Sequence, residues 1–160
     1  MKKSRKSASK KPSARSAIKR TTAKAAAQKV AAIAGVPAIG APWQGGIYAG
    51  VARGINGAND HHLIVAETDK ASVTWKDAKA WAASLEVDGH RDFSLPTRKE
   101  QALLFANAAD LFQPAWYWSN EQHASDASYA WLQFFDYGFQ YCIRQSGDYR
   151  ARAVRRLIIQ

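Results

Sequence analysis

Two short apolar runs in the first half of the chain predict a pair of strands. Residues 46–51 and 61–66 are rich in Ile, Val, Leu, Tyr and Ala. The stretch between them, residues 53–60, contains two glycines and two asparagines, which favour turns. The pattern therefore predicts a β-hairpin.

Apolar residues at helical spacing follow this hairpin and predict an amphipathic helix over residues 75–85. Thr74 and Asp77 resemble a capping box at its start, and Asp88-Gly89 ends it. The apolar positions are Trp75, Ala78, Trp81, Ala82 and Leu85. We expect both tryptophans of this face to pack in the core.

A second helix is predicted after a short extended piece at residues 93–95. Thr97 and Glu100 have the spacing of an N-terminal capping box, and we expect the helix to end at Asn107. The side chains expected to point inward are Leu103, Leu104 and Phe105.

Beyond residue 115 aromatic residues alternate with short polar turns, which predicts antiparallel strands joined by tight turns. The expected strands are 116–118, 129–134, 140–143 and 150–159, with turns at 136–138 and 146–148. Together with the two helices, these strands predict an α+β domain over residues 43–160.

Charge divides the chain into two parts. Of the 23 Lys and Arg residues, 11 lie in residues 1–30, where no acidic residue occurs, so the remaining 130 residues carry a net charge of about −1. The first 30 residues have too few large apolar side chains to offset the entropy of ordering. We expect residues 1–42 to be a disordered basic arm and linker, in which residues 21–34 form a helix on binding.

This arm predicts nonspecific nucleic-acid binding through counterion release, with a steep salt dependence. The residues expected to contact nucleic acid are Lys2, Lys3, Arg5, Lys6, Lys10, Lys11, Arg15, Lys19 and Arg20. No aromatic residue lies between them, which argues against base stacking. An assembly tail that docks on an acidic partner protein is an equal alternative.

Composition excludes several classes of protein. A single cysteine, Cys142, cannot form an internal disulfide or a multi-cysteine zinc site, and this favours a reducing compartment. No run of 18 apolar residues predicts a membrane span, and Pro37 interrupts the weakly apolar stretch that would otherwise resemble a signal peptide. We therefore expect a cytoplasmic location, with a virion-associated one as the alternative.

Five blocks of residues occur in an order that resembles the C-terminal domain family of collagen-like adhesins (Lcl). The blocks are Trp75-x-Asp77-Ala78-x-x-Trp81-x-x-x-Leu85, Gly89-x-x-Asp92-Phe93-x-Leu95-Pro96-Thr97-x-x-Glu100, Tyr117-Trp118-Ser119, Ala130-Trp131 and Arg152-Ala153-Val154-Arg155. The resemblance spans residues 46–158 and implies a C-type-lectin-like fold. Similar domains occur in phage and prophage proteins and as the variable proteins of diversity-generating retroelements.

The chain departs from that family pattern at two positions. Family members often carry one cysteine in the first helix and another in the last strand, and Ala82 and Ala153 stand there in this chain. Loss of both fits a cytoplasmic member better than a secreted adhesin. Formylglycine-generating enzymes also resemble this fold, but their pair of active-site cysteines has no counterpart here.

No residue pattern predicts a metal site or a catalytic site. His61 and His62 are adjacent on a strand and point to opposite faces, and His90 and His123 stand alone. Calcium binding near Asn120, Glu121 and Asp126 is a weaker alternative because the carboxylates are sparse. Ser119, His123 and Cys142 have commonplace spacing. We therefore expect no enzyme, no metal and no cofactor.

The region between the family blocks predicts a binding face, because it mixes Tyr, Asp, Ser and Arg in the manner of a paratope. The expected contact residues are Asp126, Ser128, Asp136, Tyr137, Phe139, Tyr141, Ile143, Arg144, Asp148 and Tyr149, with Ser125 beside them. A lobe built of turns is polar by necessity, which is the alternative explanation. Trp118 and Trp131 are expected in the core, and Arg150, Arg152, Arg155 and Arg156 are expected mainly to form structural ion pairs.

These observations predict a non-enzymatic domain that binds a protein or surface ligand through residues 120–149. Mutation of adenines in Asn codons, as retroelements produce, would yield Tyr, Asp, Ser, Phe, Ile, Arg and Cys, so a retroelement, phage or prophage variable protein fits the face. The alternative is a nucleic-acid-binding or assembly protein that acts through the basic arm. The sequence leaves the ligand and the oligomeric state open.

Overall fold

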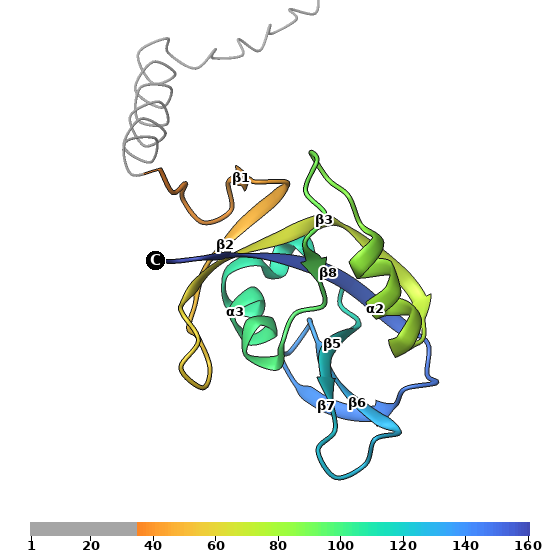
Figure 1. The fold of residues 1–160 in the computed structure, drawn as a ribbon. Helices are drawn as coiled ribbons and strands as arrows, with labels where there is room; N and C mark the ends of the chain where they lie inside the picture. The colour runs from red at the N-terminus through yellow and green to blue at the C-terminus, as the bar shows by residue number, and fades with distance from the viewer. Residues whose placement is uncertain (1–34) are drawn as a thin grey trace, which may run out of the picture. The chain divides into compact units, whose positions relative to one another are not determined.

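The computed structural model describes residues 35–160 (Figure 1). The basic arm and the expected helix at 21–34 lie outside these residues. The elements in chain order are β1 (Pro42–Trp43), β2 (Gly46–Ala52), β3 (His61–Val73), α2 (Trp75–Ser84), β4 (Phe93–Ser94), α3 (Arg98–Ala108), the 3-10 turn η1 (Ala109–Leu111), β5 (Trp116–Gln122), β6 (Tyr129–Phe134), β7 (Gln140–Arg144) and β8 (Tyr149–Ile158). Residues 38–160 form one compact unit. The predicted α+β class, with two helices and mostly antiparallel strands, is confirmed.

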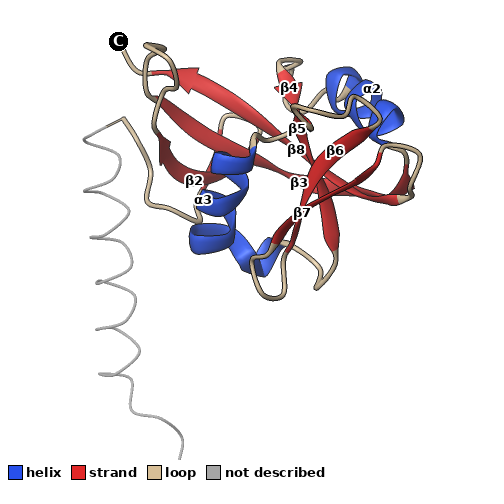
Figure 2. Ribbon diagram, turned by 90° about the horizontal axis from the view of Figure 1, so that it is seen from below, coloured by secondary structure: helices blue, strands red, loops and turns tan. Residues whose placement is uncertain are grey.

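The strands form one eight-stranded sheet with the order β1-β2-β3-β8-β5-β6-β7, and β4 pairs with β8 off this path (Figure 2). All pairs are antiparallel except β5 with β8, whose single parallel register pair joins Tyr117 to Arg150. The last strand therefore lies at the centre of the sheet and connects the β1-β2-β3 half to the β5-β6-β7 half.

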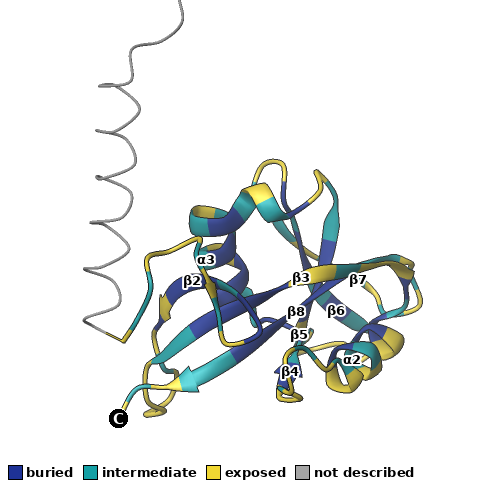
Figure 3. Cartoon of the chain, turned by 90° about the horizontal axis from the view of Figure 1, so that it is seen from above, coloured by how far each residue is buried: buried dark blue, intermediate teal, exposed yellow. Residues whose placement is uncertain are grey.

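Each face of this sheet buries one helix, because side chains alternate along β8. Ala151 and Ala153 belong to the core cluster that holds the apolar face of α2. Val154 points the other way, into the cluster that holds Leu104 of α3. The buried positions run along the central strands β3 and β8 (Figure 3). The division of the core into two clusters, one on each face of the sheet, thus follows from the alternation of side chains along β8.

Both helices begin at the predicted caps. The Thr74 hydroxyl accepts a hydrogen bond from the Asp77 backbone N–H at 3.3 Å, and α2 ends at Ser84. At α3 the capping box is complete, since Thr97 Oγ1 accepts from the Glu100 N–H and Glu100 Oε2 accepts from the Thr97 N–H. Neither helix of the described part has the length and apolar character needed to span a bilayer.

Two strands are longer than their apolar patterns predicted. β3 continues from the expected end at residue 66 to Val73, and β5 continues from residue 118 to Gln122. The extension of β3 is polar and largely exposed, and it is held by a ladder to β8 with two register shifts. Because these hydrogen bonds join β3 to a strand about 80 residues away, the local pattern of apolar residues could not predict the extension.

Trp131 is not in the core, so that prediction is wrong, whereas Trp118 is fully buried as expected. Ala130 and Leu132 of β6 point into the α2 cluster, which places Trp131 between them on the opposite face. The guanidinium carbon of Arg98 lies 3.5 Å from the centroid of the Trp131 ring. A cation thus covers this indole in place of apolar packing.

The C-terminal arginines form the structural pairs that the sequence predicted. Arg155 pairs with Asp92, and Arg156 pairs with Glu100 at 2.6 Å. Arg150 and Arg152 both approach Asp69, at 3.6 and 3.8 Å. These pairs connect β8 to β3, to the loop before β4 and to α3.

Candidate binding site

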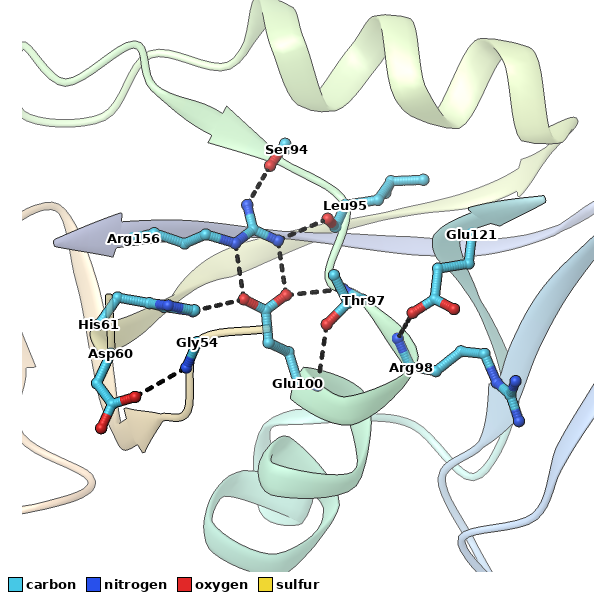
Figure 4. A network of polar contacts seen from close by, with 10 residues as sticks. All are labelled: Gly54, Asp60, His61, Ser94, Leu95, Thr97, Arg98, Glu100, Glu121 and Arg156. Atoms are coloured by element: carbon cyan, nitrogen blue, oxygen red, sulfur yellow. Dashed lines mark hydrogen bonds and ion pairs between the residues drawn. The ribbon is translucent and has the colours of Figure 1, made fainter. Parts of the chain in front are cut away.

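A buried carboxylate organises the start of α3 (Figure 4). Glu100 is 3% exposed, and its Oε1 lies 2.7 Å from His61 Nε2 and accepts from Arg156 Nε at 2.7 Å. Its Oε2 accepts from Arg156 Nη2 at 2.6 Å and from the Thr97 N–H at 2.7 Å. Because a carboxylate only accepts, His61 carries a proton on Nε2 in this arrangement. The network joins α3, β3 and β8.

This network lowers the pKa of Glu100 below its ordinary value. Burial is the largest influence and opposes ionisation, but the hydrogen bonds and charge of Arg156 outweigh it, with further help from the Thr97 N–H and His61. The carboxylate is therefore ionised and fully occupied by its protein partners.

A hollow of about 470 Å³ lies beside this network, between α3 and the loop from β2 to β3. Its aliphatic walls include Val51, Ile55, Leu103 and Ile158, and its charged lining includes Arg53, Lys99, Glu100 and Arg156. Asp60 Oδ1 accepts from the Gly54 N–H at 2.9 Å and closes the loop that carries Ile55. The hollow is thus walled by apolar groups and carries more positive than negative charge.

A second hollow of about 720 Å³ adjoins the first and shares Ile55 and Lys99 with it. Its other wall includes Phe139 and Gln140 at the start of β7. Arg98 is held there, because its Nε donates to Gln140 Oε1 at 3.0 Å while its backbone N–H donates to a Glu121 carboxylate. The two hollows lie side by side at the first turns of α3, and we call the pair the groove.

Three exposed aromatic side chains lie on the β6–β7 hairpin, and one of them, Phe139, also lines the second hollow. Tyr137 is 69% exposed, Phe139 66% and Tyr141 62%. The rings of Phe134, Tyr137 and Phe139 follow one another at centroid distances of 6.0 and 6.2 Å. We call Tyr137, Phe139 and Tyr141 the hairpin aromatics.

The predicted contact residues do not form a single patch. Eight of them are exposed, namely Asp126, Ser128, Asp136, Tyr137, Phe139, Tyr141, Arg144 and Asp148. Ile143 and Tyr149 are half-buried and pack against the α2 cluster, and the Tyr149 ring meets that of Trp118 edge-on at 5.2 Å. Asp148 and Tyr149 line a separate hollow of about 390 Å³ beside Trp116. The hairpin aromatics are the exposed large apolar side chains of the set.

Asp126 and Ser128 form a turn of their own between β5 and β6. Asp126 Oδ1 accepts from the Ser128 hydroxyl at 2.6 Å and from its backbone N–H at 2.9 Å. The side-chain hydrogen bond from Ser128, followed by the backbone one, lowers the pKa of this exposed carboxyl. The turn is therefore shaped by its own side chains.

The candidate metal and catalytic residues lie apart. His61 faces Glu100 while the His62 Nδ1 lies 2.9 Å from Tyr48 Oη on the other face of β3, as the sequence predicted. Ser119 is buried and Cys142 is half-buried. Within residues 35–160 no group of three His, Cys, Asp or Glu side chains is arranged to hold a metal ion.

Sequence reasoning missed the network of His61, Glu100 and Arg156 as one site. The sequence predicts Glu100 only as a capping residue, and it predicts Arg156 only as one half of an ion pair whose acidic partner it does not identify. The capping-box spacing and the alternation of β8 were the available signals, but the partners are separated by 39 and 56 residues. The residues expected to bind nucleic acid, from Lys2 to Arg20, lie outside the described part of the chain.

Comparison with known proteins supports one assignment. The family model described as the Lcl C-terminal domain matches residues 49–155. A search of curated proteins found no match. This family is a binding-type domain family and is not an enzyme family. Because the match covers more than half of the chain, the chain belongs to the Lcl C-terminal domain family.

Proposed function

We propose that this chain is a non-enzymatic domain that binds a protein or surface ligand through residues 120–149. The observation that carries the proposal is the exposure of the hairpin aromatics, each more than 60% accessible. Large aromatic side chains supply much of the energy of protein interfaces, since each can bury about 150–250 Å². An exposed cluster of them on one hairpin favours a binding surface.

The support beneath the hairpin fits this role. Gln140 Nε2 donates to the Arg98 backbone oxygen at 2.7 Å and to Gln133 Oε1 at 2.8 Å. Gln133 Nε2 donates to the Gln101 backbone oxygen at 3.1 Å. These bonds fix β6 and β7 on α3, so less conformational freedom is lost when the surface binds.

Polar groups lie at both ends of the β6–β7 pair and could add specificity to a bound partner. Asp136 lies in the same turn, and Arg144 places its guanidinium carbon 5.6 Å from the centroid of the Tyr129 ring. Asp126 and Ser128 occupy the β5–β6 turn, at the end of β6 away from the turn that carries Tyr137 and Phe139. Rigid aromatic side chains together with short polar side chains are the composition of a paratope.

We further propose that the face is diversified, as in a retroelement, phage or prophage variable protein. The test is deep amplicon sequencing of codons 115–152 in the source population, with codons 46–73 as the matched control. We expect substitutions at adenine-containing codons of exposed residues such as Tyr137 and Tyr141, with Trp118 and Leu132 unchanged. Equal variation in the control region, or an invariant hairpin, would contradict a diversified face.

A cytoplasmic location is proposed from the buried alanines. Ala82 and Ala153 are both fully buried in the α2 cluster, at the positions where the family resemblance places cysteines. A reducing compartment gives a paired thiol no advantage there.

The second candidate function rests on the charge of the arm, whose first 30 residues hold 11 basic and no acidic residues. We propose that it binds nucleic acid nonspecifically. Deletion of residues 1–30 should abolish binding to duplex DNA of about 20 base pairs, and the full chain should lose affinity steeply as salt rises. Binding retained after the deletion would contradict this role.

A further inference from the structure

Exposed aliphatic side chains gather in a second place, away from the hairpin aromatics. Val51 is 47% exposed, Ile55 40% and Ile158 59%, and all three line the 470 Å³ hollow beside Glu100. They come from β2, from the loop after it and from the end of β8. In the described part of the chain, three of seven exposed large apolar side chains therefore surround one hollow.

The charges at this hollow are unbalanced. Glu100 is its acidic residue, and both carboxylate oxygens are already occupied by Arg156, His61 and Thr97. Arg53 and Lys99 are exposed, and neither lies within 4.0 Å of an acidic side chain of residues 35–160. The rim therefore offers two cations without a counter-charge.

The shape favours an elongated occupant. The two hollows share Ile55 and Lys99, so the groove offers two adjacent recesses. The walls of the first recess are aliphatic, and the second recess is more polar, with Gln133 and Gln140. A peptide can place one side chain in each recess.

We propose that this groove binds a peptide segment of another protein that carries an aliphatic side chain beside acidic residues. The aliphatic side chain enters the recess between Ile55 and Leu103, and the acidic groups pair with Lys99 and Arg53. The chain's own arm does not fit as the occupant, because both the arm and the rim are positively charged and would repel each other. Nucleic acid would meet the cations but has no aliphatic group for the recess.

This proposal rests on the first hollow and its cations, whereas the hairpin aromatics contribute only Phe139 to the second hollow, and the experiment separates the two surfaces through residues that they do not share. The full chain is immobilised and a phage-displayed library of random peptides of about twelve residues is selected on it. Three variants are compared with the wild type: Lys99→Glu and Ile55→Asp in the groove, and Tyr141→Ser on the hairpin. All three replaced residues are exposed, so circular dichroism should show native folds for the variants.

We expect the wild type to enrich peptides that contain Leu or Ile next to Asp or Glu. Recovery of these clones should fall about tenfold on Lys99→Glu and on Ile55→Asp, and change less than about twofold on Tyr141→Ser. A fresh selection on Lys99→Glu should enrich Lys or Arg instead of acidic residues. Reversal of the selected charge is a result that a general loss of folding cannot produce.

Several outcomes would overturn the proposal. The first is that no motif of acidic and aliphatic residues is enriched. The second is that recovery of the selected clones is the same on Lys99→Glu and Ile55→Asp as on the wild type. The third is that recovery falls only on Tyr141→Ser, which would place the site on the hairpin. Duplex DNA can also be tested as a competitor of the selected peptides, on a chain that lacks residues 1–30. If DNA displaces the peptides and Lys99→Glu abolishes this displacement, the rim binds nucleic acid and the proposal is wrong. Failure of the hairpin as a binding face would leave the groove result unchanged.

Discussion

Replacement of Glu100 by Gln should destabilise the domain strongly. The carboxylate receives four donors from His61, Thr97 and Arg156. A glutamine offers a single oxygen, and its NH₂ group would face N–H donors. Glu100→Gln therefore removes the counter-charge of Arg156 and leaves buried donors without acceptors.

The size of the effect follows from burial. Breaking a fully buried ion pair costs about 3–5 kcal/mol. The Glu100 side chain is 3% exposed but that of Arg156 is 25% exposed, so water partly compensates the arginine. We expect a loss of about 3 kcal/mol in the free energy of unfolding, which corresponds to a fall in Tm of about 10 °C. This is a large share of the stability of a domain of this size.

Urea denaturation, monitored by tryptophan fluorescence, measures this loss. The mutation should shift the midpoint of the transition and leave unchanged the dependence of the free energy of unfolding on urea concentration. The matched control is Glu86→Gln, because Glu86 and Arg91 form an ion pair at 2.8 Å whose side chains are 48% and 75% exposed. That control should cost less than about 1 kcal/mol.

The pH dependence provides a second, independent test. The pKa of Glu100 is below its ordinary value of 4.5, so the ionised carboxylate stabilises the fold above pH 4.5. This contribution is lost as the pH falls through the lower, folded-state pKa. The difference between wild type and Glu100→Gln should therefore be full near neutral pH and shrink in acid. Equal stability of the two proteins at pH 7 would refute the reasoning.

Two further predictions concern the binding face. Gly138 has a φ of +77°, and an added Cβ would lie 2.8 Å from Phe105 Cε1. Gly138→Ala should therefore lower the free energy of unfolding by about 1–2 kcal/mol, as measured by urea denaturation. An unchanged midpoint would contradict the strained turn. Ser128→Ala removes the hydroxyl that lowers the pKa of Asp126, so NMR titration of that carboxyl should give a pKa closer to its ordinary value of 3.8. A titration curve identical to that of the wild type would show that the backbone N–H of residue 128 lowers the pKa without the hydroxyl.

Local features of the sequence predicted both helices with their starts and the position of most strands. The caps at Thr74 and Thr97 act within three residues, and both helices begin there as predicted. The alternation of β8 likewise predicted that its arginines would find acidic partners. Side-chain periodicity and capping depend on neighbours along the chain, which is why these features could be predicted without the fold.

The tertiary structure decided where the surfaces lie. Trp131 is covered by Arg98 from a helix 33 residues earlier, and β3 is extended by a ladder to β8. The groove beside Glu100 needs β2, β3, α3 and β8 together, and none of these segments carries a local sign of it. Burial, ion pairing and hollows depend on distance in space between segments far apart in the chain. The sequence alone therefore determined the helices, most of the strands, the family and the charge of the arm, and the fold decided how far β3 and β5 extend and which side chains meet at each surface.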